Sequence, residues 1–126
     1  KLADHHSIFF LPAQTQSNGK AGLNHVSYEM VDIDDVFMGH EILQKQGYEL
    51  EWGIGRHYSG SQIFDYWRSP FGQIHEHQTD GDVFDNSFPP QVVDIMLEGD
   101  PNNPEPGPSQ WGPPINMETF GDERGL

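Results

Sequence analysis

The chain contains no cysteine, so it has neither a disulfide framework nor thiolate chemistry. Basic residues are scarce as well: six Lys and Arg stand against 20 Asp and Glu, and the formal net charge is -14. A chain this acidic repels phosphate backbones and anionic lipid, which argues against nucleic acid and membrane surfaces as partners. No apolar run is long enough to cross a bilayer. A cytoplasmic location is therefore the default expectation.

Hydrophobic residues are sparse and unevenly distributed. They make up 34% of the 126 residues, so we expect one domain or part of one, with a small core. Residues 81–126 hold eight of the ten prolines, nine acidic residues and a single basic one. This composition predicts an extended tail with a short helix near 92–97, polyproline-like stretches, and Trp111 as an anchor in a groove. The chain begins K-L-A-D without an initiator Met, so a fragment or a processed chain is one interpretation.

The apolar pattern in the first part of the chain predicts the order β-α-β-β-β. Alternating patterns that are typical of strands occupy 24–30, 49–55, 62–67 and 73–78. Asp32 is suited to cap a helix whose apolar positions fall on one stripe, and Gly47 is suited to end it. The run S-I-F-F-L at 7–11 predicts a further, buried strand, placed as if it closed an earlier unit. The expected fold class is α+β.

Polar residues recur on one face of the predicted sheet. Glu76 shares its face with Ile74, and Tyr66 in the preceding strand shares its face with Phe64. If the sheet curls so that this face is concave, His25 from the first strand meets Glu76 inside. A histidine and a carboxylate are two-thirds of the 2-His-1-carboxylate triad that holds non-haem Fe(II) with open positions. Three other histidines, on the helix or the opposite face, are interpreted as structural: His40, His75 and His77.

Three motifs together resemble a known family. The run W-G-I-G-R-H-Y-S-G-S-Q-I-F-D-Y-W-R-S-P-F-G-Q-I-H-E, with H-H-S-I-F-F-L and L-N-H-V-S-Y-E-M upstream, resembles the final part of the type I extradiol (ring-cleaving) dioxygenases of the vicinal oxygen chelate superfamily, which also contains the glyoxalase and bleomycin-resistance proteins. These enzymes are built from repeated βαβββ modules, two of which curl around one metal ion. The resemblance implies three parts: the last strand and linker of a preceding module at 1–21, the final βαβββ module at 22–80, and an acidic, Pro-rich tail at 81–126.

The resemblance also implies roles for individual residues. His25 and Glu76 match metal-binding residues, and the implied metal is Fe(II), with Mn(II) as an alternative. His6 matches the catalytic histidine near the end of the preceding module, and His57 and Tyr66 match two residues beside the substrate. The implied reaction is the cleavage of a catechol by dioxygen next to the diol, with both oxygen atoms entering the product. Tyr66 and His57 would then hydrogen-bond the substrate, and His6 would act as acid and base.

Two features depart from the family pattern. Ser69 occupies a turn position where many relatives carry Asp, which bears on turn stability more than on chemistry. The family's first metal-ligand histidine opens the preceding module, so this chain shows two ligands. We therefore expect a preceding module as the partner that supplies the third ligand, together with a catechol-type substrate, O2 and assembly as a homo-oligomer.

Two alternatives keep the same fold. A glyoxalase-like, metal-dependent isomerase or hydrolase does not need the set of His6, His57 and Tyr66. A metal-free small-molecule-binding module does not need His25 and Glu76. The residue types therefore favour ring cleavage, and the identity of the catechol is left open.

Overall fold

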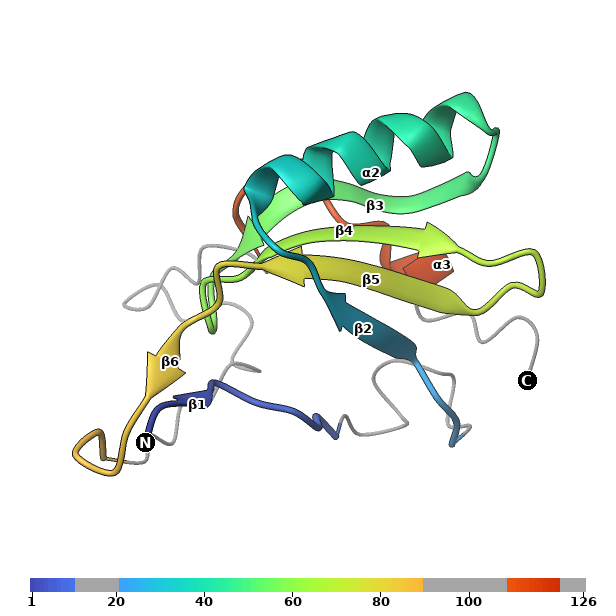
Figure 1. Ribbon diagram of the computed structural model, residues 1–126. Helices are drawn as coiled ribbons and strands as arrows, with labels where there is room; N and C mark the ends of the chain where they lie inside the picture. Colours follow the sequence, from blue (N-terminus) through green and yellow to red (C-terminus); the bar gives the residue numbers. More distant parts are fainter. Residues whose placement is uncertain (11–20, 90–108, 121–126) are drawn as a thin grey trace, which may run out of the picture.

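The computed structural model describes residues 1–10, 21–89 and 109–120 of the chain (Figure 1). The elements between residues 25 and 79 follow the predicted order: β2 His25–Glu29, α2 Ile33–Lys45, β3 Glu49–His57, β4 Ile63–Arg68 and β5 Ile74–Thr79. The fold class and the βαβββ order predicted from the sequence are therefore confirmed. No helix in these described ranges is long and apolar enough to cross a membrane.

The five-stranded sheet has the order β2-β5-β4-β3-β7. β2 pairs in parallel with β5, because α2 and the β3–β4 hairpin carry the chain back before β5 begins. The other pairs are antiparallel, and β5 is central enough to have a partner on each side. In this register Ser27 of β2 and Tyr66 of β4 both lie opposite Glu76. The pairing of strands therefore brings residues distant in sequence around one carboxylate.

Helix α2 covers one face of this sheet, above β3 and β4 in Figure 1. It begins as predicted at Asp32, whose side chain accepts a hydrogen bond of 3.0 Å from the Asp35 backbone N–H. It ends at Lys45, and Gly47 follows with a φ of +78°, a left-handed conformation that glycine adopts without strain. Val36 is the helix residue that is fully buried, so the predicted apolar stripe is covered only along its centre.

The core lies on the opposite face of the sheet and is mainly aromatic. Its buried members are Trp52, Phe64, Tyr66, Ile74 and Phe120. The Trp52 ring stacks on Tyr66 with centroids 5.4 Å apart, and Phe120 meets Tyr66 edge-on at 5.2 Å. Aromatic pairs of this kind each add about 0.5–1.5 kcal/mol beyond the burial of their area. The core therefore packs aromatic rings against Tyr66 on more than one side.

The predicted buried strand at 7–11 is wrong over its described part. Residues 7–10 form no strand, and the side chains of Ile8, Phe9 and Phe10 are exposed, although the Phe9 ring lies 6.0 Å from the His6 ring; Leu11 lies outside the described residues. The strand near the N-terminus is instead β1 Ala3–Asp4, which pairs antiparallel with β6 Val83–Phe84. An apolar run indicates burial, but burial needs a partner surface.

The described end of the tail packs on the module. β7 Ser109–Trp111 extends the sheet beside β3, and α3 Met117–Phe120 follows it. The Trp111 side chain is 44% exposed, so the predicted anchor is wrong; Phe120, 7% exposed, is the buried aromatic residue of this segment. The helix predicted at 92–97 and the proline-rich run at 101–108 lie outside the described residues.

Two glycines allow β7 to approach β3. Gly112 has a φ of +119°, and a Cβ added to it would lie 2.6 Å from the Gly55 Cα atom. A Cβ added to Gly55 would lie 2.5 Å from the Phe64 ring and 2.8 Å from the Trp111 carbonyl oxygen. Side chains at either position would push the tail off the sheet edge.

Candidate metal centre

The concave face of the sheet brings together four of the five predicted site residues. His25 opens β2, His57 ends β3, Tyr66 lies in β4 and Glu76 lies in β5. Each strand contributes one residue because alternate side chains point to the same face. The four side chains form a cluster that we call the Glu76 cluster.

Glu76 is the centre of this cluster and is 2% exposed. Its Oε2 atom lies 3.5 Å from His25 Nε2, and its Oε1 atom lies 3.5 Å from His57 Nε2. Burial alone would raise the pKa of Glu76, but the side chains of His25, His57 and Ser27 lower it well below its ordinary value. The carboxylate therefore stays charged at neutral pH inside the fold.

One oxygen of Glu76 has unused bonding capacity. Oε1 is buried, and within residues 1–10, 21–89 and 109–120 no group donates a hydrogen bond to it. A buried carboxylate oxygen usually has a partner, because leaving it unpaired costs free energy. The 3.5 Å separations from both histidines are also longer than ordinary charge-assisted hydrogen bonds. The contacts of Glu76 with the two histidines are therefore long ion pairs.

Tyr66 and His57 form a hydrogen-bonded pair beside the carboxylate. Tyr66 Oη lies 2.9 Å from His57 Nε2. Burial raises the pKa of Tyr66 well above its ordinary value, and the negative charge of Glu76 raises it further. The phenol is therefore neutral and able to donate at neutral pH.

His25 makes a contact that the sequence analysis did not identify. Its Nδ1 atom lies 2.7 Å from Asn24 Oδ1, and Asn24 Nδ2 donates to the Phe120 carbonyl oxygen at 3.2 Å. The signal available in the sequence was the amide residue directly before the histidine in N-H-V. Its second partner is 96 positions away, which no local pattern indicates.

His6 lies apart from the Glu76 cluster. It follows β1, its side chain is exposed, and its Nδ1 atom is 2.9 Å from His5 Nδ1. Desolvation lowers the pKa of His6 and His5 lowers it further, while the charge of Glu76 acts in the opposite direction. His6 is thus within electrostatic range of Glu76. It also lines a polar cavity of about 160 Å³ that none of the four cluster residues lines.

The residues of the cluster fit a divalent metal ion of intermediate softness. One imidazole nitrogen and one carboxylate are donors that Fe(II) and Mn(II) accept. The unpartnered oxygen of Glu76 has room for a further bond. In the part of the chain that the structure describes, no group of three or more His, Cys, Asp or Glu residues could hold a metal. The assignment of His25 and Glu76 as metal ligands stays a prediction.

Comparisons with known proteins give relatives but no matching family model. The chain is 35% identical over 113 residues to Metapyrocatechase 2 of Cupriavidus necator, a match covering 90% of this chain and 32% of the relative. The 2,3-dioxygenase LapB from Pseudomonas sp. KL28 has a TM-score of 0.53 at 22% identity, covering 58% of this chain and 25% of that one. A catechol 2,3-dioxygenase structure has a TM-score of 0.53 at 19% identity, covering 79% and 29%.

These structural likenesses show that the chain shares its fold with part of each of these two dioxygenase structures. The sequence match to a metapyrocatechase agrees with the resemblance to extradiol dioxygenases that the motifs indicate. The chain spans about a third of the length of the curated relative that it matches.

Proposed function

We propose that the chain is the C-terminal part of the catalytic domain of a non-haem Fe(II)-dependent extradiol dioxygenase, which cleaves a catechol-type diol with O2. The observation that carries this proposal is the Glu76 cluster: a charged, buried carboxylate faces an imidazole at 3.5 Å, beside a neutral tyrosine paired with a second histidine. The relationship to a metapyrocatechase supports it.

In this proposal His25 Nε2 and the Glu76 carboxylate hold the metal, either Fe(II) or Mn(II). A preceding module supplies the third ligand, and the chain divides into parts at 1–21, 22–80 and 81–126. When bound, the metal brings the two diol oxygens and O2 together on one ion. The charge of Glu76 is already present in the folded chain, so binding a cation needs no deprotonation of this ligand at neutral pH.

Tyr66 and His57 act on the substrate. Tyr66 keeps its proton at neutral pH, because its pKa is raised, and donates a hydrogen bond to a diol oxygen. His57 Nε2, 2.9 Å from the tyrosine oxygen, orients that hydroxyl and exchanges a proton with it. Trp52, Phe64 and Phe120 pack against Tyr66, and the rings of Trp52 and Phe64 also lie against His57, so the pair is shielded from most of the solvent. A dry surrounding strengthens each of these polar contacts.

His6 serves as the acid and base. Its lowered pKa leaves the imidazole neutral at neutral pH, so it is able to accept a proton from the diol and to return one later. It lies on the segment after β1, close enough to feel the charge of Glu76. Tyr66 stays protonated at neutral pH because its pKa is raised, so it is not available to accept this proton.

Oxygen uptake on addition of catechol tests this function. The protein loaded with Fe(II) should consume one O2 per catechol and form a product absorbing as a ring-opened semialdehyde. Glu76→Gln should abolish the uptake, and Glu41→Gln, on the exposed side of α2, should leave it unchanged. Turnover of a glyoxalase-type substrate without oxygen, or catechol binding without any uptake, would overturn the proposal.

A further inference from the structure

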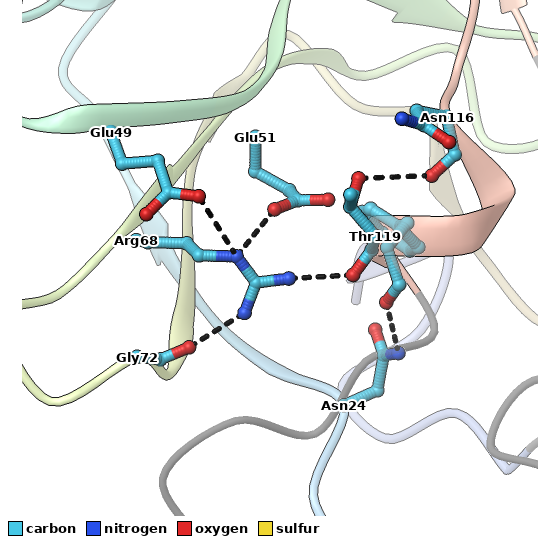
Figure 2. A network of polar contacts seen from close by, with 8 residues as sticks. Asn24, Glu49, Glu51, Arg68, Gly72, Asn116 and Thr119 are labelled. Carbon is cyan, nitrogen blue, oxygen red and sulfur yellow. Dashed lines mark hydrogen bonds and ion pairs between the residues drawn. The ribbon is translucent and has the colours of Figure 1, made fainter.

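Asn24 lies between His25, the candidate metal ligand, and helix α3. Its side chain lies beside the last described turn of α3, as Figure 2 shows. On its other side, its amide oxygen lies 2.7 Å from His25 Nδ1. The neighbouring contact in the same network is Arg68, which donates to the Thr119 carbonyl oxygen at 2.6 Å. Two side chains from the module thus hold two successive carbonyl groups of α3.

The direction of the Asn24 amide follows from its partners. The Phe120 carbonyl oxygen only accepts hydrogen bonds, so the amide nitrogen of Asn24 faces it, at 3.2 Å. The amide oxygen therefore faces His25 Nδ1, at 2.7 Å. Because an amide oxygen also only accepts, Nδ1 carries the proton of the neutral ring, and Nε2 has a free electron pair.

Glu76 favours the opposite tautomer of His25. A charged carboxylate 3.5 Å from Nε2 would be stabilised by a proton on that nitrogen. A ring with its proton on Nε2 would donate to Glu76 and would have no electron pair for a metal at this position. The amide oxygen of Asn24 has the opposite effect, because it stabilises the tautomer with the proton on Nδ1 by accepting a hydrogen bond from it. Asn24 and Glu76 therefore compete for one proton, and the outcome decides whether His25 is able to act as a ligand.

We propose that Asn24 is a positioning residue that holds His25 in the Nδ1–H form, with Nε2 free for a metal, and that α3 holds Asn24 in this orientation. The inference rests on the proposed function, since it concerns the partner of a candidate ligand. The hydrogen bond from Asn24 to the Phe120 carbonyl oxygen matters because it fixes the orientation of the amide. If the amide flipped, its nitrogen would face His25, and the Nδ1–H tautomer would no longer be stabilised. Arg68, itself paired with buried Glu51, keeps α3 in place for that purpose.

The tautomer of His25 is measured directly by long-range ¹H–¹⁵N correlation in the metal-free chain, at a pH where the ring is neutral. The wild-type chain should show the proton on Nδ1. Asn24→Leu, which removes the acceptor, should shift it to Nε2. Asn24→Asp replaces the donor toward Phe120 by an acceptor and adds a negative charge, but it keeps an acceptor toward His25, so it should retain the Nδ1–H form. A wild-type ring protonated on Nε2 overturns the proposal without any variant having to fold.

Binding of Mn(II) tests the consequence for the metal. Losing the outer partner of a ligand histidine typically weakens metal binding about 10- to 100-fold, and Asn24→Leu should fall in this range. Thr119→Ala is the matched control, because it removes a 3.3 Å hydrogen bond within α3 to the Asn116 carbonyl oxygen and does not touch His25. Wild-type affinity in Asn24→Leu would contradict the proposal.

The two levels of inference fail separately. If Glu76→Gln binds Mn(II) as tightly as the wild-type chain, the proposed metal site is wrong, whatever the tautomer of His25. If Glu76→Gln loses the metal but Asn24→Leu changes neither tautomer nor affinity, the metal site stands and the role of Asn24 is wrong.

Discussion

The two faces of the sheet each carry a histidine beside a buried carboxylate, and the two pairs differ in how they are closed. On the helix side, Asp65 is 0% exposed and accepts from Trp67 Nε1 at 2.5 Å and from His40 Nδ1 at 3.0 Å. On the concave side, Glu76 lies 3.5 Å from His25, and one of its oxygens has no hydrogen-bond donor in the described residues. The two pairs have the same residue types, and they differ in how completely the hydrogen bonds of the carboxylate are made.

The two carboxyl groups also differ in their pKa values: that of Asp65 is raised and that of Glu76 is lowered. Burial raises the pKa of Asp65, and its bonds to Trp67 and His40 only reduce that effect. Burial also acts to raise the pKa of Glu76, but His25, His57 and Ser27 overcome it and lower the value. On the concave face, the surroundings of Glu76 favour its charged form, which is the form that binds a cation. On the helix face, the surroundings of Asp65 disfavour its charged form.

The largest expected effect is on metal content, which should differ between a substitution at Glu76 and one at Asp65. Glu76→Gln should abolish metal retention, because a neutral amide supplies neither the charge nor a good hard ligand. Asp65→Asn should leave the metal content unchanged, since Asp65 lies on the other face. Both are measured by metal analysis after gel filtration of the chain together with the preceding module that supplies the third ligand in the proposal. Full metal occupancy in Glu76→Gln would remove this residue from the site.

The next largest effect is expected from His6, the proposed acid and base. His6→Phe should leave metal and catechol binding largely intact and slow turnover by a factor on the order of 10², the usual range for a positioned acid or base. Single-turnover oxygen consumption separates this step from binding. His40→Phe is the control on the helix side and should keep the rate. A wild-type rate in His6→Phe would refute the assignment of His6.

A smaller effect is expected from the helix-side pair, and on stability rather than metal. Asp65→Ala leaves the N–H groups of Trp67 and His40 without their acceptor, at a cost of about 1–3 kcal/mol in the free energy of unfolding. Urea denaturation of the metal-free chain measures it. An unchanged midpoint would show that the pair on this face is not structural.

The smallest effect is the pH dependence of that stability. Because the pKa of Asp65 is raised above its ordinary value of 3.8, the folded chain binds the proton more tightly than the unfolded chain. The stabilisation from protonated Asp65 is present at low pH and is lost as pH rises from near 3.8 through the raised folded value. The stability difference between wild type and Asp65→Ala should therefore decrease over that window. A difference that increases with pH would give Asp65 a lowered pKa.

The sequence predicted the elements that depend on local signals. Period-two alternation located β2 to β5, and Asp32 and Gly47 marked both ends of α2, because caps and pleats act within a few residues. The face assignment placed His25, Tyr66 and Glu76 together for the same reason. Their roles as ligands and catalytic groups stay predictions.

The contacts that the sequence missed depend on distant partners. Phe120 is buried because α3 crosses the aromatic core, and Asn24 matters because Phe120 brings a carbonyl group beside it. The apolar run that includes Phe9 indicated a buried strand, yet it is exposed because no described segment covers it. Periodicity reports the tendency of a segment to be buried and not the surface that buries it.

The central claim is that the concave pair, and not the helix-side pair, is the metal site. Titrating Mn(II) into the ¹⁵N-labelled chain tests it most directly, because the paramagnetic ion broadens nearby amide signals selectively. The account predicts that the signals of His25, Ser27 and Glu76 broaden at the lowest Mn(II) additions, before those of His40 and Asp65. Broadening centred on His40 and Asp65, or uniform broadening over the whole chain, would contradict it.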